Sequence, residues 1–172
     1  GSKWRGFSLL ELILVMVIVA GLLALTAPLL RDFALRRKVH EAARTLLALC
    51  RYARLAAASE ARTYRLLVRE EQGAFRLLAQ EGAAFVPLYS SWGKVFQAPE
   101  GVSVFWVEEG PAWERGYLEF DPRGRSDPAH FVFMDKEGTV LHVLSRAPNE
   151  RFRIVEQEEL DLYEVTDQKI GR

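Results

Sequence analysis

The sequence has little of what builds most small active or metal-bound sites. A single cysteine among 172 residues forms no internal disulfide, and the three histidines share none of the spacings that hold zinc or an iron–sulfur cluster. Net charge is also absent, because 23 basic side chains balance 23 acidic ones, which excludes a polybasic tail protein. We therefore expect no metal and no cofactor. With 49% hydrophobic residues, there is enough apolar material for one core.

Motifs for catalysis are missing as well. Ser8 and Ser126 do not lie in a Gly-x-Ser-x-Gly turn, and no glycine-rich phosphate loop precedes a helix. The acids between residues 121 and 137 lack the alternating spacing of a calcium-binding loop. The sequence thus predicts a protein that is not an enzyme; an anchored single-pass enzyme remains the alternative, and a pocket with converging titratable groups would favour it.

What the sequence does have is one long apolar run. Residues 12–30 are nineteen consecutive uncharged residues. As a helix rising 1.5 Å per residue they reach roughly 28 Å, close to the hydrocarbon core of a bilayer at about 30 Å. The run is apolar all round, whereas a helix buried in a small soluble domain would keep a polar face. We therefore expect a membrane-spanning helix over residues 7–30, in contact with the lipid bilayer.

Charge is distributed unevenly along the chain. Residues 1–76 carry 13 basic and 6 acidic side chains, a net charge of +7, and residues 77–172 carry 10 and 17, a net charge of −7. Opposed charges of this size favour association with copies of the chain or with a charged partner.

The residues before the apolar run resemble a processing signal. A short basic segment ends at Gly6, Phe7 follows it, and Glu11 stands four residues beyond Phe7. This pattern resembles the N-terminus of the type IV prepilin family. The resemblance implies that a prepilin peptidase cuts between Gly6 and Phe7 and methylates the new amine, so that residues 1–6 are a leader, of which residues 1–2 look like a cloning remnant. Pro28 falls where pilins commonly carry a helix-bending proline.

Glu11 is an acid at the start of an apolar helix. A carboxylate in the centre of a membrane costs about 2.5–3.5 kcal/mol, and less near the interface. One interpretation is that Glu11 pairs with the amine of Phe7 on a neighbouring subunit, which offsets this cost and fixes the register of assembly. The other is a first-turn acid stabilised by the helix dipole and hydrated at the headgroups.

The resemblance also implies a location and partners. The chain would be a single-pass protein of the inner membrane, with its globular part in the periplasm, and would later join a pilus or pseudopilus filament. Its partners would be other pilin or pseudopilin subunits, the peptidase and the inner-membrane assembly platform. The basic residues that follow the run outnumber Lys3 and Arg5, so the positive-inside rule favours the opposite orientation. We follow the motif because it is more specific.

Beyond the apolar run the helical pattern becomes amphipathic over residues 31–61. Apolar residues recur at helical spacing and include Cys50, which we expect to be a core residue. Arg37, Arg44 and Arg51 lie seven residues apart on another face. This face is either solvated, with some pairs to acids of neighbouring subunits, or a track for nucleic acid.

Residues 62–172 show the period of two that is typical of strands. A hairpin is predicted around the turn at residues 69–73, which ends in glycine. A long helix followed by about seven antiparallel strands predicts an α+β fold in which one β-sheet packs on the helix. The strands are expected at residues 63–68, 74–80, 102–107, 117–120, 131–134, 139–144 and 151–155, with a weaker one at 160–165.

The segment from Tyr117 to Ile154 resembles the C-terminal pattern of GspH/FimT-type minor pseudopilins. Glu150 stands where that pattern often has the glycine of Gly-Arg-x-Arg. Some transformation pilins of this kind bind DNA through this region, and the resemblance gives that role to Arg151 and Arg153. Acids surround both residues, so the other interpretation is that they are strand residues paired with nearby carboxylates. A structural filament subunit is the first hypothesis, and a DNA-binding minor pilin of a DNA-uptake pilus is the alternative.

Overall fold

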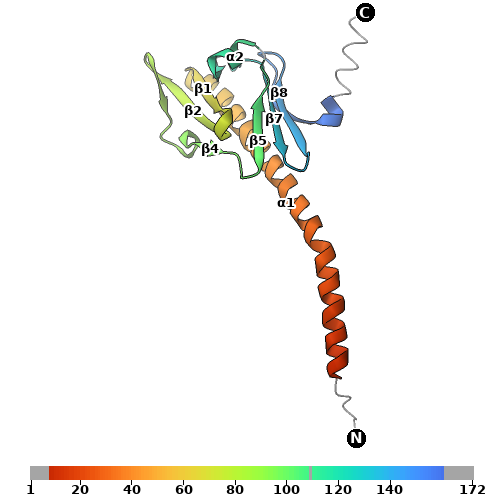
Figure 1. Ribbon diagram of the computed structural model, residues 1–172. Helices are drawn as coiled ribbons and strands as arrows, with labels where there is room; N and C mark the ends of the chain where they lie inside the picture. Colours follow the sequence, from red (N-terminus) through yellow and green to blue (C-terminus); the bar gives the residue numbers. More distant parts are fainter. Residues whose placement is uncertain (1–7, 109, 161–172) are drawn as a thin grey trace, which may run out of the picture. The chain divides into compact units, whose positions relative to one another are not determined.

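A computed structural model describes residues 8–108 and 110–160; the side chains of residues 24–35 and of Pro111 lie outside this description. The chain divides into two compact units, Gly1–Leu35 and Arg36–Arg172. Each unit is described by itself, with its elements labelled in Figure 1.

Helix α1 (Leu9–Glu60) contains the described part of the first unit and begins the second. Ser8 caps its start, because its Oγ accepts a hydrogen bond from the backbone N–H of Leu10 at 3.3 Å. At the other end Ala61 adopts a left-handed conformation with φ of 52°, and the N–H of Arg62 bonds to the carbonyl of Ala57. This arrangement satisfies one of the last carbonyls and ends the helix. The helix predicted from residue 7 to about 61 is confirmed over its described length.

The first sheet lies next to α1 in the second unit. Its main path runs in the order β3-β2-β1-β6, all antiparallel, and β4 also pairs with β2. The predicted hairpin is confirmed: β1 and β2 are joined by the 3-10 turn η1 (Glu70–Gln72), and Gly73 follows with φ of 56°, which glycine adopts without strain. The strands are β1 (Tyr64–Arg69), β2 (Ala74–Glu81), β3 (Ala84–Pro87), β4 (Phe96–Gln97) and β6 (Tyr117–Phe120).

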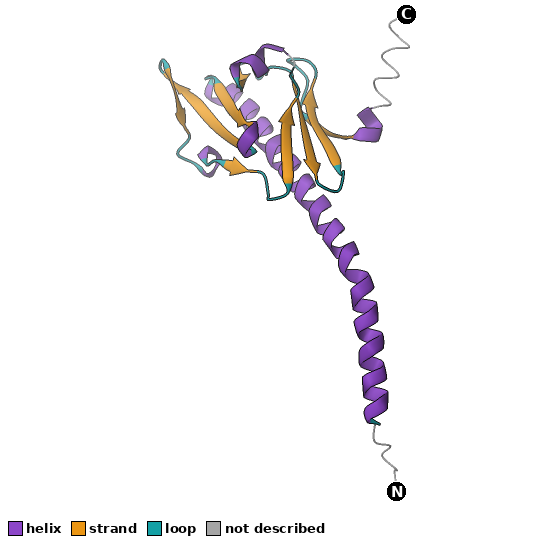
Figure 2. Cartoon of the chain, in the orientation of Figure 1, coloured by secondary structure: helices purple, strands orange, loops and turns teal. Residues whose placement is uncertain are grey.

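The second sheet is antiparallel too and has the order β5-β7-β8-β9. Figure 2 shows the strands of both sheets beside the helix in this unit. The α+β class is therefore confirmed, but two sheets replace the single sheet that was expected. The strands are β5 (Val102–Trp106), β7 (Ala129–Asp135), β8 (Val140–Ser145) and β9 (Arg153–Glu156).

Several elements differ from the prediction. Strands β3 and β4 and the short helix α2 (Gly110–Arg115) lie where the sequence predicted neither a helix nor a strand. Strand β4 has only two residues, and its pairing with β2 rather than its own sequence defines it. The weak strand expected at 160–165 is wrong at its start, since residues 157–160 form a helical turn; its other residues lie outside the described part.

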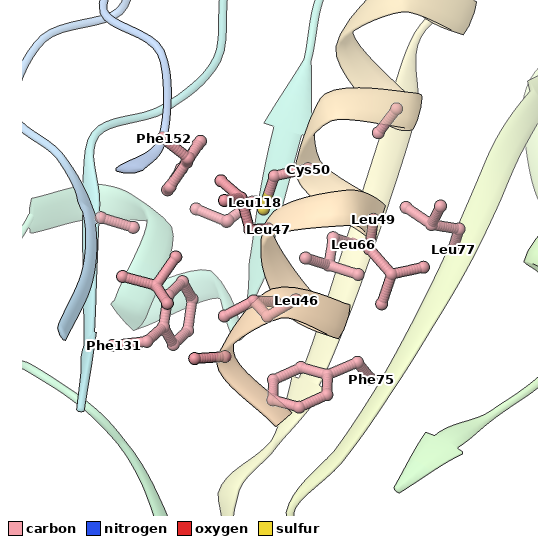
Figure 3. Close-up of a cluster of buried hydrophobic side chains, with 14 of the residues drawn as sticks. Leu46, Leu47, Leu49, Cys50, Leu66, Phe75, Leu77, Leu118, Phe131 and Phe152 are labelled. Atoms are coloured by element: carbon pink, nitrogen blue, oxygen red, sulfur yellow. The ribbon is translucent and has the colours of Figure 1, made fainter. Parts of the chain in front are cut away.

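The core of the second unit forms where α1 meets both sheets. Buried helix residues recur at helical spacing, and Leu46, Leu49 and Cys50 have almost no exposed surface. Figure 3 shows these side chains among Leu66 from the first sheet and Phe131 from the second. Burial raises the pKa of the Cys50 thiol far above its ordinary value, which keeps it protonated. Cys50 is thus a core residue, as the sequence predicts.

Candidate assembly helix and arginine surfaces

The first turns of α1 expose apolar surface on every side. All described side chains from residue 8 to 23 are exposed, and the least exposed large ones, Val19 and Val15, still show 45% and 46% of their surface. Such a continuous apolar surface is unusual on a monomeric soluble protein and marks a site of interaction. Within the described residues, none of the helices has the length and apolar character that a membrane crossing requires.

The predicted processing residues Gly6 and Phe7 lie outside the described residues, as does the side chain of Pro28. Glu11 is exposed in the first turn of α1. Ser8 and Glu11 have the spacing of a capping box, a signal for the helix start. Pairing of Glu11 with a neighbouring amine and the bend at Pro28 therefore stay predictions.

The predicted arginine face is exposed in the second unit. Arg37, Arg44 and Arg51 are all exposed, and their spacing of seven residues places them on one face of the helix. Arg37 and Arg44 border an open hollow of about 380 Å³ together with His40 and Glu41. The acid at Glu41 places negative charge within the row, so the face is not purely cationic.

Arg54, one turn after Arg51 in the same helix, has a different role. Its Nη2 donates hydrogen bonds of 2.6 Å to the Oγ of Ser126 and to the carbonyl of Glu150. Burial, and to a smaller extent the charge of Arg151, lowers the pKa of the Arg54 guanidinium. Arg54 therefore ties α1 to the loop between β8 and β9 instead of forming a free surface charge. Helical periodicity alone does not reveal this loop contact.

Arg151 and Arg153 have different surroundings. Arg151 is exposed before β9. Arg153 lies in β9, and its Nε is 3.8 Å from the Oε1 of Glu150, whose other carboxylate oxygen accepts a hydrogen bond from the N–H of Arg146. The carboxylate that replaces the glycine of the Gly-Arg-x-Arg pattern thus forms a long ion pair with one of the two arginines.

The acids considered as calcium ligands shape turns. Asp135 Oδ1 accepts hydrogen bonds of 2.9 Å from the N–H groups of Glu137 and Thr139. Burial alone would raise the pKa of Asp135, but these hydrogen bonds outweigh it and lower the pKa. Asp121 accepts equivalent bonds of 2.9 Å from the N–H groups of Arg123 and Arg125. No group of three metal-ligating side chains occurs within the described ranges.

His130 and His142 lie on adjacent strands of the second sheet. The Nε2 of His130 is 2.8 Å from the Nδ1 of His142, whose Nε2 lies 2.8 Å from the Oε1 of Gln157. Because Gln157 Oε1 accepts, His142 donates from Nε2 and accepts at Nδ1 from His130. The chain of bonds positions the turn at residues 157–160 on this sheet.

The long helix and the two antiparallel sheets define a pilin-type α+β fold. The minor pseudopilin EpsH from the type 2 secretion system of Vibrio cholerae has this fold: one structure is 11% identical, has a TM-score of 0.59, and the match covers 69% of this chain and 97% of that chain. A second EpsH structure, also 11% identical, has a TM-score of 0.58, with 70% and 95% covered.

The type IV minor pilin FimU of Pseudomonas aeruginosa is 17% identical over 73% of this chain and 92% of that chain, with a TM-score of 0.49. No family model matches the sequence, and no curated protein matches it. At these identities what is shared is the fold, and the resemblance that the sequence suggested is confirmed at that level.

Proposed function

We propose that this chain is a minor pilin or pseudopilin, a structural subunit of a type IV pilus or a type II secretion pseudopilus. The observation that carries the proposal is a pilin-type globular unit in a chain whose first helical turns expose apolar surface on all sides. A helix of this kind is stable only in lipid or among other apolar helices. A filament subunit uses both environments in turn.

The finer steps rest on the sequence. Residues 7–30 hold the chain in the inner membrane, with the globular part in the periplasm, until a prepilin peptidase has cut after Gly6. The assembly platform then moves the subunit into the filament, where Glu11 meets the amine of Phe7 on a neighbour. Mass spectrometry of the chain from its native cells tests the cut directly: the expected N-terminus is methylated Phe7, and a chain that retains residues 3–6 would contradict it.

Replacing Glu11 by alanine tests the assembly step. A charge left without its partner in an apolar environment costs about 3–5 kcal/mol, so incorporation of Glu11→Ala into filaments should fall more than about tenfold while its amount in membranes is unchanged. Sheared filaments and membranes are compared by quantitative immunoblot. Glu41→Ala, which removes an exposed acid of α1 in the second unit, is the matched control and should assemble normally. Normal assembly of Glu11→Ala would remove the pairing from the proposal.

A DNA-binding role is the second candidate, and the observation in its favour is the exposure of Arg37, Arg44, Arg51 and Arg151. The full chain in non-ionic detergent is titrated against duplex DNA at increasing salt. Binding through these groups should weaken steeply with salt, and the Arg37→Gln, Arg44→Gln, Arg51→Gln triple variant should reduce the slope by about 3. If the chain does not bind DNA even at low salt, this candidate is eliminated.

A further inference from the structure

Arginines on the outer face of the first sheet differ in whether their own chain provides a partner for the guanidinium. Arg65 forms an ion pair with Glu119 at 2.9 Å and stacks on the rings of Phe85 and Tyr117, with its Cζ 3.6 Å and 4.3 Å from their centres. This guanidinium is satisfied by its own chain, through a carboxylate and two aromatic faces.

Two other arginines of the same face have no such partner. In the register of β1 and β2, Arg76 stands opposite Leu67, and Arg69 stands opposite Ala74, so both arginines lie on the face that carries Arg65. Among the described residues, neither Arg69 nor Arg76 takes part in an ion pair or a side-chain hydrogen bond. The Nε of Arg76 is also buried and has no hydrogen-bond partner there. A buried donor of a charged group without a partner destabilises the folded chain.

The two arginines border one hollow of about 220 Å³. Leu67 and Val95 supply apolar walls, Gln72 adds an amide, and no acid occurs among the described residues that line it. Val95 is 57% exposed at the hollow, so apolar surface is available to a partner as well. The lining thus offers N–H donors and positive charge beside an apolar surface, which is complementary to a carboxylate carried by an apolar segment.

We propose that this hollow, which we call the Arg69–Arg76 pocket, binds a glutamate or aspartate side chain of a different pilin-type subunit adjacent in the filament. The Nη groups of Arg76, which stand beyond its buried Nε, would donate to the carboxylate, and Arg69 contributes a second cation. The bound carboxylate provides the partner that Arg76 lacks within its own chain. The identity of the occupant rests on the proposed filament function, whereas the carboxylate chemistry of the pocket does not.

The chemistry is tested on the full chain in non-ionic detergent by isothermal titration calorimetry. The probe is the peptide acetyl-Val-Glu-Leu-Glu-Val-amide, and its glutamine counterpart is the uncharged comparison. We expect the acidic peptide alone to bind, with affinity reduced about tenfold or more by Arg76→Gln and unchanged by Arg123→Gln, which removes the same charge from an exposed turn. Equal binding of the two peptides, no binding of either, or equal effects of the two substitutions would overturn the pocket.

Stability separates a binding role from a folding role. Replacing Arg76 by leucine removes the unpartnered donor and adds apolar surface beside Leu67, so the isolated chain should melt about 2–4 °C higher while losing the acidic peptide. A lower melting temperature for Arg76→Leu would mean that Arg76 serves the fold of its own chain, and would overturn the proposal.

The occupant is tested in cells that build the filament. A photo-reactive residue at position 95 should cross-link to another pilin-type subunit within a few residues of an acid, and Arg76→Gln should abolish the product. The same group at the fully exposed Tyr89 is the control. Cross-linking to a second copy of this chain, to a protein without the pilin fold, or to nothing would overturn the occupant. If the chain entered no filament but still bound the acidic peptide, the proposed function would fail and the pocket would stand.

Discussion

The two described stretches of α1 are both rich in apolar residues, yet their exposure is opposite. Between residues 8 and 23 every side chain is exposed, whereas between residues 36 and 60 most apolar side chains follow one buried stripe. Helix propensity therefore does not distinguish them. What differs is the source of the packing partner: the strands of its own unit cover the second stretch, and no described residue covers the first.

This difference has an energetic consequence. A Leu side chain that is fully buried contributes about 1.5–3 kcal/mol relative to an exposed one. The second stretch gains this energy when its chain folds. The first stretch gains no such energy from the described residues of its own chain, and under the proposed function its apolar residues serve insertion and assembly rather than folding.

The largest expected effect on stability is at the centre of the buried stripe. Leu46 has no exposed surface and packs between the two sheets, so Leu46→Ala should lower the free energy of unfolding by about 2–5 kcal/mol. Urea titration of the full chain in detergent, followed by tryptophan fluorescence, measures the change. Leu55 of the same helix is 71% exposed, and Leu55→Ala should change stability by less than about 0.5 kcal/mol. Equal losses would mean that the stripe is assigned to the wrong face.

A smaller effect is expected at the end of the second stretch, where Tyr64 is buried and its hydroxyl donates to Glu60 at 2.8 Å. Tyr64→Phe should cost about 1 kcal/mol near pH 7. Burial, together with the hydrogen bond to Glu60, raises the pKa of Tyr64 to about 12. Because the folded pKa lies above the unfolded value of about 10, the contribution is complete below pH 10 and is lost as the pH rises toward 12.

Urea titrations at pH 7 and pH 11, which measure the free energy of unfolding of wild type and of Tyr64→Phe, test this prediction. The difference between wild type and Tyr64→Phe should shrink at the higher pH. A difference that grows with pH would contradict the sign, and a difference that stays constant would show that the phenol does not titrate in this range.

The sequence predicts the elements better than their arrangement. The stripe through Leu46 and Cys50 and the hairpin before Gly73 follow from periodicity and turn chemistry, and both are confirmed. The alternation of apolar and polar residues identifies which residues of a strand are buried, but it does not predict which strands pair with each other. The sequence therefore predicted a single sheet, whereas strands β5, β7, β8 and β9 form a second sheet of their own.

The candidate sites show the same limit. Exposure of Arg37, Arg44 and Arg51 follows from helical spacing alone. Arg54 differs from them because a loop about a hundred residues further along meets it, and Arg76 differs from Arg65 because only Arg65 has a carboxylate on the neighbouring strand. Such long-range contacts leave no local pattern in the sequence. Glu11 is identifiable from its motif, and its pairing with Phe7 stays a prediction.

The smallest expected effect on folding is in the exposed stretch, and it is the sharpest test of the comparison. Leu14 is 59% exposed, so Leu14→Ala should leave the free energy of unfolding of the full chain in detergent, measured by urea titration, within about 0.5 kcal/mol of wild type. The same residue change at Leu46 costs several times more, although both residues lie in one helix. A loss of about 2 kcal/mol or more at Leu14 would show that this stretch packs against its own chain. Its apolar surface would then serve folding, and the distinction between the two stretches would no longer hold.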